Sequence, residues 1–203
     1  LNDVSINSGK VGTEAIVSGI AARFMDNGTE IGGFDLYCTS DVLTGSGISS
    51  SAAFETLIGT IIDAYYNGGR SGAIEIAKIG QFAENVYFGK QSGLMDQTVS
   101  SVGGLVSIDF INAENPIVKS FNFDFEEYGY CLCITDTKSS HADLTDDYTA
   151  IRSEMETVAR QFGKPCLRQV SEAAFYNDIP RLRKSCSDRA IVRAARSEER
   201  RVG

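Results

Sequence analysis

The sequence predicts an α+β fold, because helical and strand-like stretches are mixed without a regular alternation of strand and helix. Long stretches with apolar residues at helical spacing predict helices in both halves of the chain. Shorter stretches that alternate or run apolar predict strands, most of them near the middle. With 203 residues, of which 42% are hydrophobic, the chain can bury a core in one domain or in two small ones.

The first half is expected to hold four helices and one strand. Residues 13–25 have apolar side chains on one helical face, and an Asn-Gly pair ends this helix. Residues 33–39 alternate apolar and polar side chains, which is typical of a half-buried strand. Helical spacing returns in residues 52–66, 71–88 and 94–102, which are separated by turns that contain glycine.

The second half begins with strands and ends with helices. Strands are expected at residues 105–110, 117–123 and 130–136, and the last two of these alternate or run apolar. Helices are then expected at residues 143–162, 171–184 and 188–201. The sequence has no internal repeat, low-complexity tract or long linker.

The distribution of charge restricts the classes of partner. The formal net charge is −8 at pH 7. From Arg181 to the end the chain has eight basic and three acidic residues, so the acidic excess lies entirely in the preceding part. An acidic body argues against nucleic acid as a partner. The basic tail fits an RNA-binding arm or, with greater weight, one face of a helix.

Composition favours a protein of the cytoplasm with no membrane partner. No apolar run approaches the ~20 residues that span a membrane, and no signal sequence is recognised. The five cysteines form an odd set without metal-type spacing, and Cys131 and Cys133 share one face of an expected strand. We therefore expect reduced, buried thiols in a cytoplasmic protein.

A stretch of glycines and serines immediately precedes the amphipathic helix expected at residues 52–66. Glycine allows a tight turn or a close approach to a ligand, and serine favours helix N-caps. The free amides and the dipole of a helix N-terminus attract anions. A flexible capping loop is the alternative, but the abrupt junction with the helix favours a phosphate-binding loop. It comprises Gly45, Ser46, Gly47, Ile48, Ser49, Ser50 and Ser51.

This loop resembles the second motif of the GHMP kinases, a family that includes galactokinase and homoserine and mevalonate kinases. Their pattern is Pro-x-x-x-Gly-Leu-Ser-Ser-Ser-Ala, and here Leu43 and Ile48 stand where proline and leucine are expected. No Lys-Ser or Lys-Thr pair ends the loop, so it is not of the Walker type. A second motif, Gly-Leu-Met-Asp-Gln at residues 93–97, follows Ala-Glu-Asn at residues 83–85 and resembles the galactokinase branch.

The resemblance implies ATP and Mg²⁺ as cofactors and a hexose, most simply galactose, as substrate. It implies that Ser51 and Glu84 bind magnesium, which prefers oxygen ligands. It implies that Asp96 lies beside the anomeric hydroxyl and takes its proton or steadies the attacking oxygen, and that Tyr148 contacts the sugar. His141, the only histidine, is interpreted as a local structural residue rather than a general base.

The resemblance also implies a domain division. Residues 1–111 would form part of the GHMP N-terminal ATP-binding domain, of the ribosomal protein S5 domain 2-like α/β type. Residues 112–203 would begin the C-terminal α+β galactokinase domain. The family's opening Gly-Glu-His-Thr-Asp-Tyr segment and its closing glycine-rich motif do not occur in the sequence.

We therefore expect the chain to be the central part of a longer kinase that phosphorylates the C1 hydroxyl of galactose. By itself the chain is expected to lack this activity and to self-associate through uncovered apolar surfaces. Two alternatives remain open at this point. One is a kinase for a related sugar such as N-acetylgalactosamine, and the other is a non-catalytic galactokinase-like sensor that regulates a partner.

Overall fold

The computed structural model describes residues 3–6, 9–42, 47–135 and 145–196, without the side chains of residues 145–149. The chain divides into two compact units. The first consists of Leu1–Val106 and Ser120–Asp143, and the second of Ser107–Lys119 and Leu144–Gly203. Among the described residues, no helix is long and apolar enough to cross a membrane.

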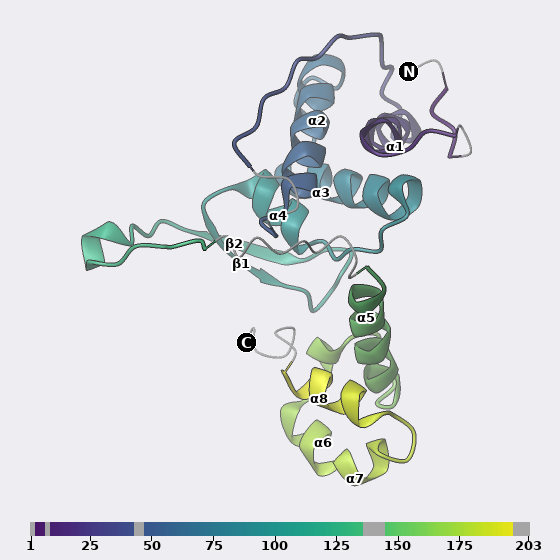
Figure 1. Ribbon diagram of the computed structural model, residues 1–203, viewed down its shortest axis with the longest axis vertical. Coiled ribbons are helices and arrows are strands. Elements are labelled where there is room, and N and C mark those ends of the chain that lie inside the picture. Colours follow the sequence, from purple (N-terminus) through teal and green to yellow (C-terminus); the bar gives the residue numbers. More distant parts are fainter. Residues whose placement is uncertain (1–2, 7–8, 43–46, 136–144, 197–203) are drawn as a thin grey trace. The chain divides into compact units, whose positions relative to one another are not determined.

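In the part of the chain that the structure describes, the first unit is built on four α-helices, all close to the positions that the sequence predicts. In Figure 1 helix α1 is seen end-on, α2 stands upright and α3 runs across it, so the three helices have different directions. The bounds are α1, Thr13–Asp26; α2, Ser50–Tyr66; α3, Ala73–Phe82; and α4, Met95–Val102.

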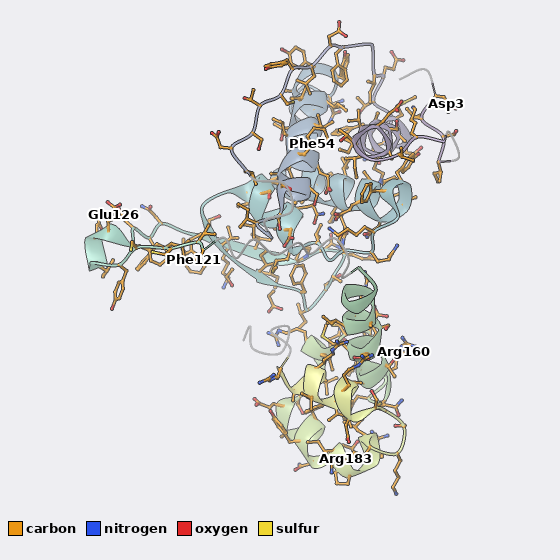
Figure 2. The ribbon with its side chains drawn as sticks, in the orientation of Figure 1. Asp3, Phe54, Phe121, Glu126, Arg160 and Arg183 are labelled. Atoms are coloured by element: carbon orange, nitrogen blue, oxygen red, sulfur yellow. The ribbon has the colours of Figure 1, made fainter. Side chains whose placement is uncertain are left out.

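Isoleucines from three helices form the core of the first unit. Ile20 of α1 and Ile62 of α2 are completely buried, and Ile79 of α3 packs into the same cluster. Phe54, labelled in Figure 2, is partly buried at the edge of this cluster. The three apolar faces that the 3.6-residue periodicity predicts therefore meet in one core.

The helix expected at residues 71–88 ends in a wider turn than predicted. Residues Ala73–Phe82 are α-helical, whereas Ala83–Phe88 form a π-helix, η1. Gly89 closes it in a left-handed conformation with φ of 83°, which favours glycine. A π-turn inserts one residue into the helical ladder and is often found at functional sites.

One glycine allows α1 and η1 to pack closely. A Cβ atom added at Gly19 would lie 2.8 Å from the Tyr87 ring and 2.9 Å from Ala83. Such distances are shorter than van der Waals contact, so any side chain at this position would push the two helices apart.

Two of the four expected strands are present. β1, Leu105–Asp109, and β2, Ile117–Phe121, pair in a two-stranded sheet. The strand predicted at residues 33–39 is wrong, because this segment is irregular and has no sheet partner among the described residues. A strand needs a neighbour for its backbone hydrogen bonds, and an alternating pattern alone cannot supply one.

The strand predicted at residues 130–136 is also wrong over its described part, 130–135. Cys131 and Cys133 share one side, with their sulfur atoms 3.6 Å apart, but both are exposed rather than buried. Cys38 is exposed as well, and Cys166 and Cys186 are half-buried. All five cysteines are free thiols, and none of them is fully buried, so the expectation of buried thiols is wrong.

The second unit has a separate core made by helices from the end of the chain. Val158 of α5, Leu182 of α7 and Ala194 of α8 are fully buried in it, together with Leu167 and Phe175. In Figure 1 these helices occupy the green and yellow part of the ribbon. The bounds are α5, Thr145–Arg160; η4, Leu167–Gln169; α6, Glu172–Asn177; α7, Ile179–Leu182; and α8, Asp188–Arg196.

The helix predicted at residues 171–184 is divided into α6 and α7. Asp178 ends α6 and precedes α7, and Pro180 lies in the first turn of α7. Proline lacks the amide that a continuous helix would need but is tolerated in a first turn, so a new helix starts here. The other two helices predicted in this half are confirmed within the described residues.

Arginines of the basic tail lie on a helix face and form ion pairs. Arg189 and Arg193 of α8 contact the two carboxylate oxygens of Glu154 on α5, the latter at 2.7 Å. Within the second unit, Asp109 at the end of β1 pairs with Arg168 of η4 at 2.9 Å. The described part of the tail therefore agrees with the helix-face interpretation.

Candidate active site

The serine-rich loop leads directly into α2, as the sequence predicts. The helix begins at Ser50, and Ser49 is its N-cap residue. Ser49 has φ of 57° and is the one described residue other than glycine with a positive φ. A non-glycine residue in this left-handed region is strained, and such strain is concentrated at functional sites. Gly45 and Ser46 lie outside the described residues.

The first amides of α2 are available to a ligand. Among the described residues, none accepts a hydrogen bond from the amides of residues 50–52. The side chain of Ser49 does not accept from these amides either, and its hydroxyl donates to Asp96 Oδ2. These donors have no acceptor among the described residues, and with the partial positive charge of the helix start they can attract an anion.

Asp96 lies in the first turn of α4 and is exposed. Its contact with Ser49 joins the start of α4 to the start of α2, and these two helices pack against each other and against α3. Figure 1 shows the three helices side by side. The carboxylate is thus held beside the loop while one side of it stays open to a substrate.

Glu84 is a second carboxylate of this site and, unlike Asp96, it is buried. Its side chain is 2% exposed and comes from η1. Glu84 Oε1 accepts a hydrogen bond from Ser51 Oγ at 3.3 Å and another from Lys90 Nζ at 2.8 Å. A buried carboxylate is stable only when it is paired in this way.

A second layer of polar side chains lies behind Glu84. Gln97 Nε2 donates to Glu84 Oε2 at 3.0 Å and to Glu55 Oε2 at 2.9 Å, and Gln97 and Glu55 are each 1% exposed. Glu55 Oε1 and Gln97 Oε1 have no hydrogen-bond partner among the described residues. Burial first, and then the charge of Glu84, raise the pKa of Glu55 to about 8. A proton on Glu55 would turn one of these unpaired acceptors into a donor.

Close packing brings Glu55 of α2 against α3. A Cβ atom added at Gly80 would lie 3.1 Å from Glu55 Cβ and 3.5 Å from Gln97. A larger residue at position 80 would therefore displace the polar layer.

Lys90 completes the electrostatics of the site. Burial disfavours its charged form, but the hydrogen bond and the charge of Glu84, followed by the charges of Glu55 and Asp96, raise the pKa of Lys90. The charges of three carboxyl groups therefore act on the ammonium group of Lys90.

The structure brings together Ser49, Ser51, Glu84 and Asp96 of the residues that the sequence singled out. Tyr148 lies on α5, where its side chain is not described, and His141 is outside the described residues.

Sequence reasoning missed the roles of Glu55, Lys90 and Gln97. Glu55 follows Ser51 by one helical turn, so it lies on the same face of α2, and this spacing could have suggested it. The position of Lys90 depends on the π-turn, for which the sequence gives no clear signal.

Ser51 and Glu84 form a suitable start for a magnesium site. Both offer oxygen ligands, and the 3.3 Å between Ser51 Oγ and Glu84 Oε1 is close to the roughly 2.9 Å that separates adjacent ligands of an octahedral Mg²⁺ ion. No group of three or more acidic, histidine or cysteine side chains forms a metal site in the described parts of the chain. A metal here would take its other ligands from phosphate and water, as Mg²⁺ commonly does.

The part of the chain that holds this site is similar to a known protein family. Residues 15–104 match the family described as GHMP kinases N terminal domain, and this range contains the whole polar cluster around α2. This part of the chain is similar to the N-terminal domain of the GHMP kinases.

The chain is also similar to a galactokinase. Over 188 residues it is 32% identical to the galactokinase of Streptomyces coelicolor. The alignment covers 93% of this chain and 48% of the relative, so the chain spans about half the length of that protein. The resemblance to the galactokinase branch that the motifs indicate is therefore confirmed.

Proposed function

We propose that this chain forms the nucleotide-phosphate and catalytic-carboxylate part of a sugar kinase that phosphorylates the C1 hydroxyl of galactose. The observation that carries this proposal is the meeting of two pairs, Ser49 with Asp96 and Ser51 with Glu84, at the N-terminus of α2. The similarity to galactokinase supports ATP as the phosphoryl donor and galactose as the acceptor.

The loop and helix start would hold the phosphates of ATP. The amides of residues 50–52, which have no acceptor among the described residues, and the dipole of α2 favour negative charge. We assign the same role to the rest of the loop, Gly45 to Ile48, from the motif that it matches. Ser51 and Glu84 would bind Mg²⁺, which when bound neutralises charge on the transferred phosphoryl group.

Asp96 would act on the acceptor. It orients the C1 hydroxyl and takes its proton as the C1 oxygen bonds to the γ-phosphorus and the bond from this phosphorus to ADP breaks. The hydroxyl of Ser49 holds one oxygen of Asp96, so the other remains available to the sugar. We assign Tyr148 to sugar contact from the motif alone, together with the domain division at residue 111.

Catalysis of this kind depends on complete positioning of both substrates, which can contribute on the order of 7–11 kcal/mol to the lowered barrier. We therefore propose that the 203-residue chain alone does not turn over galactose. The free state of all five thiols supports a reducing, cytoplasmic location.

The test measures ADP release with galactose, and with N-acetylgalactosamine, by the longest natural protein that contains this chain. Asp96→Asn should abolish most turnover while binding of a fluorescent ATP analogue stays nearly unchanged. Asp35→Asn, at an exposed position on the segment before α2, serves as control if its nucleotide binding and turnover match those of the parent. Turnover by the Asp96→Asn variant equal to that of the parent would overturn the assignment, and tight binding without any turnover by the parent would favour a sensor.

A further inference from the structure

The contact between Lys90 and Glu84 occupies the oxygen that a metal ion would need. Lys90 Nζ lies 2.8 Å from Glu84 Oε1, and Ser51 Oγ lies 3.3 Å from the same oxygen. These are the two side chains to which we assign the magnesium ion. The ammonium therefore neutralises the carboxylate on the side that faces Ser51.

The backbone builds this contact through the π-turn. In an α-helix two residues six positions apart lie on different faces. Here Gly89 lies in the left-handed region, and the amide of Lys90 donates to the carbonyl of Glu84 at 3.1 Å. This arrangement returns the side chain of Lys90 over Glu84.

Lys90 is far more exposed to solvent than the carboxylate with which it pairs. The side chain of Lys90 is 42% exposed, whereas that of Glu84 is 2% exposed. The long, flexible stem of a lysine can move its ammonium away without any rearrangement of the helices. The ammonium of Lys90 also interacts electrostatically with the carboxyl groups of Glu55 and Asp96, and not with Glu84 alone.

We propose that Lys90 is the resident counter-ion of the cation site and competes with a divalent metal ion for Glu84. This inference rests on the proposed role of Ser51 and Glu84 as metal ligands. The ammonium satisfies the buried carboxylate in the metal-free protein and repels an approaching dication. Binding of a metal ion by itself is consequently weak and requires that the ammonium leave Glu84 Oε1.

The experiment titrates the 203-residue chain with Mn²⁺ alone and measures free Mn²⁺ by electron paramagnetic resonance. Lys90→Met keeps the stem and removes the charge. It should bind Mn²⁺ roughly tenfold more tightly than the parent, as expected when one like charge beside a charged site is removed. Lys90→Arg, which keeps the charge, should bind as weakly as the parent. Lys164→Met, at an exposed position in the second unit, controls for the loss of one positive charge from the chain.

A double variant separates this inference from the proposed function. Adding Glu84→Gln to Lys90→Met should return Mn²⁺ binding to the parent's level or below. If Lys90→Met binds Mn²⁺ with the same affinity as the parent, Lys90 does not compete with the metal ion. If Glu84→Gln nevertheless weakens Mn²⁺ binding, the assignment of Glu84 as a metal ligand still stands. Tight binding that survives Glu84→Gln would overturn both. If Lys90→Met does not fold, as judged by circular dichroism, Lys90→Gln is measured with the same expectations.

Discussion

Ser49 donates its hydroxyl hydrogen bond to Asp96 on another helix, although it is the N-cap residue of α2. Serine at an N-cap normally accepts from an amide of its own helix. Here no described residue accepts from those amides, the backbone of Ser49 is in the left-handed region and Asp96, the catalytic candidate, is held in place. One residue thus connects the phosphate-binding loop to the carboxylate that would act on the sugar.

Substitution of Ser49 should separate stability from activity. Ser49→Gly relieves the positive φ and removes the contact to Asp96, so the free energy of unfolding should stay the same or rise by up to about 1 kcal/mol. Turnover by the full kinase should nevertheless fall. Ser49→Ala loses the same contact but keeps the strain, so it should be less stable than Ser49→Gly in urea denaturation. Equal activity of all three proteins would show that the contact has no catalytic value.

Glu55 should make the stability of the fold depend on pH. Its pKa is raised from 4.5 to about 8, so the folded state holds a proton that the unfolded state releases above pH 4.5. The stabilisation is fully present below pH 4.5 and is lost as the pH rises through about 8.

Glu55→Gln removes this titration. Relative to the parent, the variant should therefore gain stability between pH 5 and pH 8, by on the order of 2–4 kcal/mol. Urea denaturation at several pH values measures the difference, and Glu30→Gln at an exposed position is the control. A constant difference between Glu55→Gln and the parent over this range would show that Glu55 does not titrate there.

Gln97 should be important for stability because its single amide nitrogen serves two buried carboxyl groups. Gln97→Met preserves the approximate volume but leaves Glu55 and Glu84 with fewer partners. Each buried polar group that loses its partner costs about 1–3 kcal/mol, so a loss of a few kcal/mol is expected in urea denaturation. Gln91→Met, at an exposed position, should change little.

Gly19 should not tolerate a side chain. In an unconstrained helix, Gly→Ala would stabilise by about 1 kcal/mol. At position 19 the added Cβ would lie 2.8 Å from the Tyr87 ring, so Gly19→Ala should instead destabilise by about 1–3 kcal/mol. At Gly33 a Cβ would meet nothing within 4 Å, so Gly33→Ala is the matched control. Thermal unfolding of both variants checks the prediction.

Apolar side chains beyond β2 should drive self-association of the isolated chain. Leu132 and Ile134 are 77% and 70% exposed. Large exposed apolar patches favour association, so sedimentation velocity should show oligomers whose fraction rises with concentration. Leu132→Lys with Ile134→Lys should shift the distribution toward monomer. An unchanged distribution would exclude this segment as the cause.

Much of this protein could be predicted from local sequence alone. The helices of the first unit are predicted within about two residues, because their apolar periodicity and glycine-rich boundaries are local signals. The loop before α2, together with the Glu84 and Asp96 motifs, could be found in the same way, because each motif is a short run of residues whose types already suggest its chemistry.

Tertiary structure decided the rest, because it depends on partners far apart in the chain. The segments at residues 33–39 and 130–135 have strand-like patterns but gain no pairing partner among the described residues, so they remain irregular. Glu55, Glu84 and Gln97 form one buried network only because α2, η1 and α4 meet there. The π-turn then places Lys90 on Glu84, a contact that an ordinary α-helical turn would not allow.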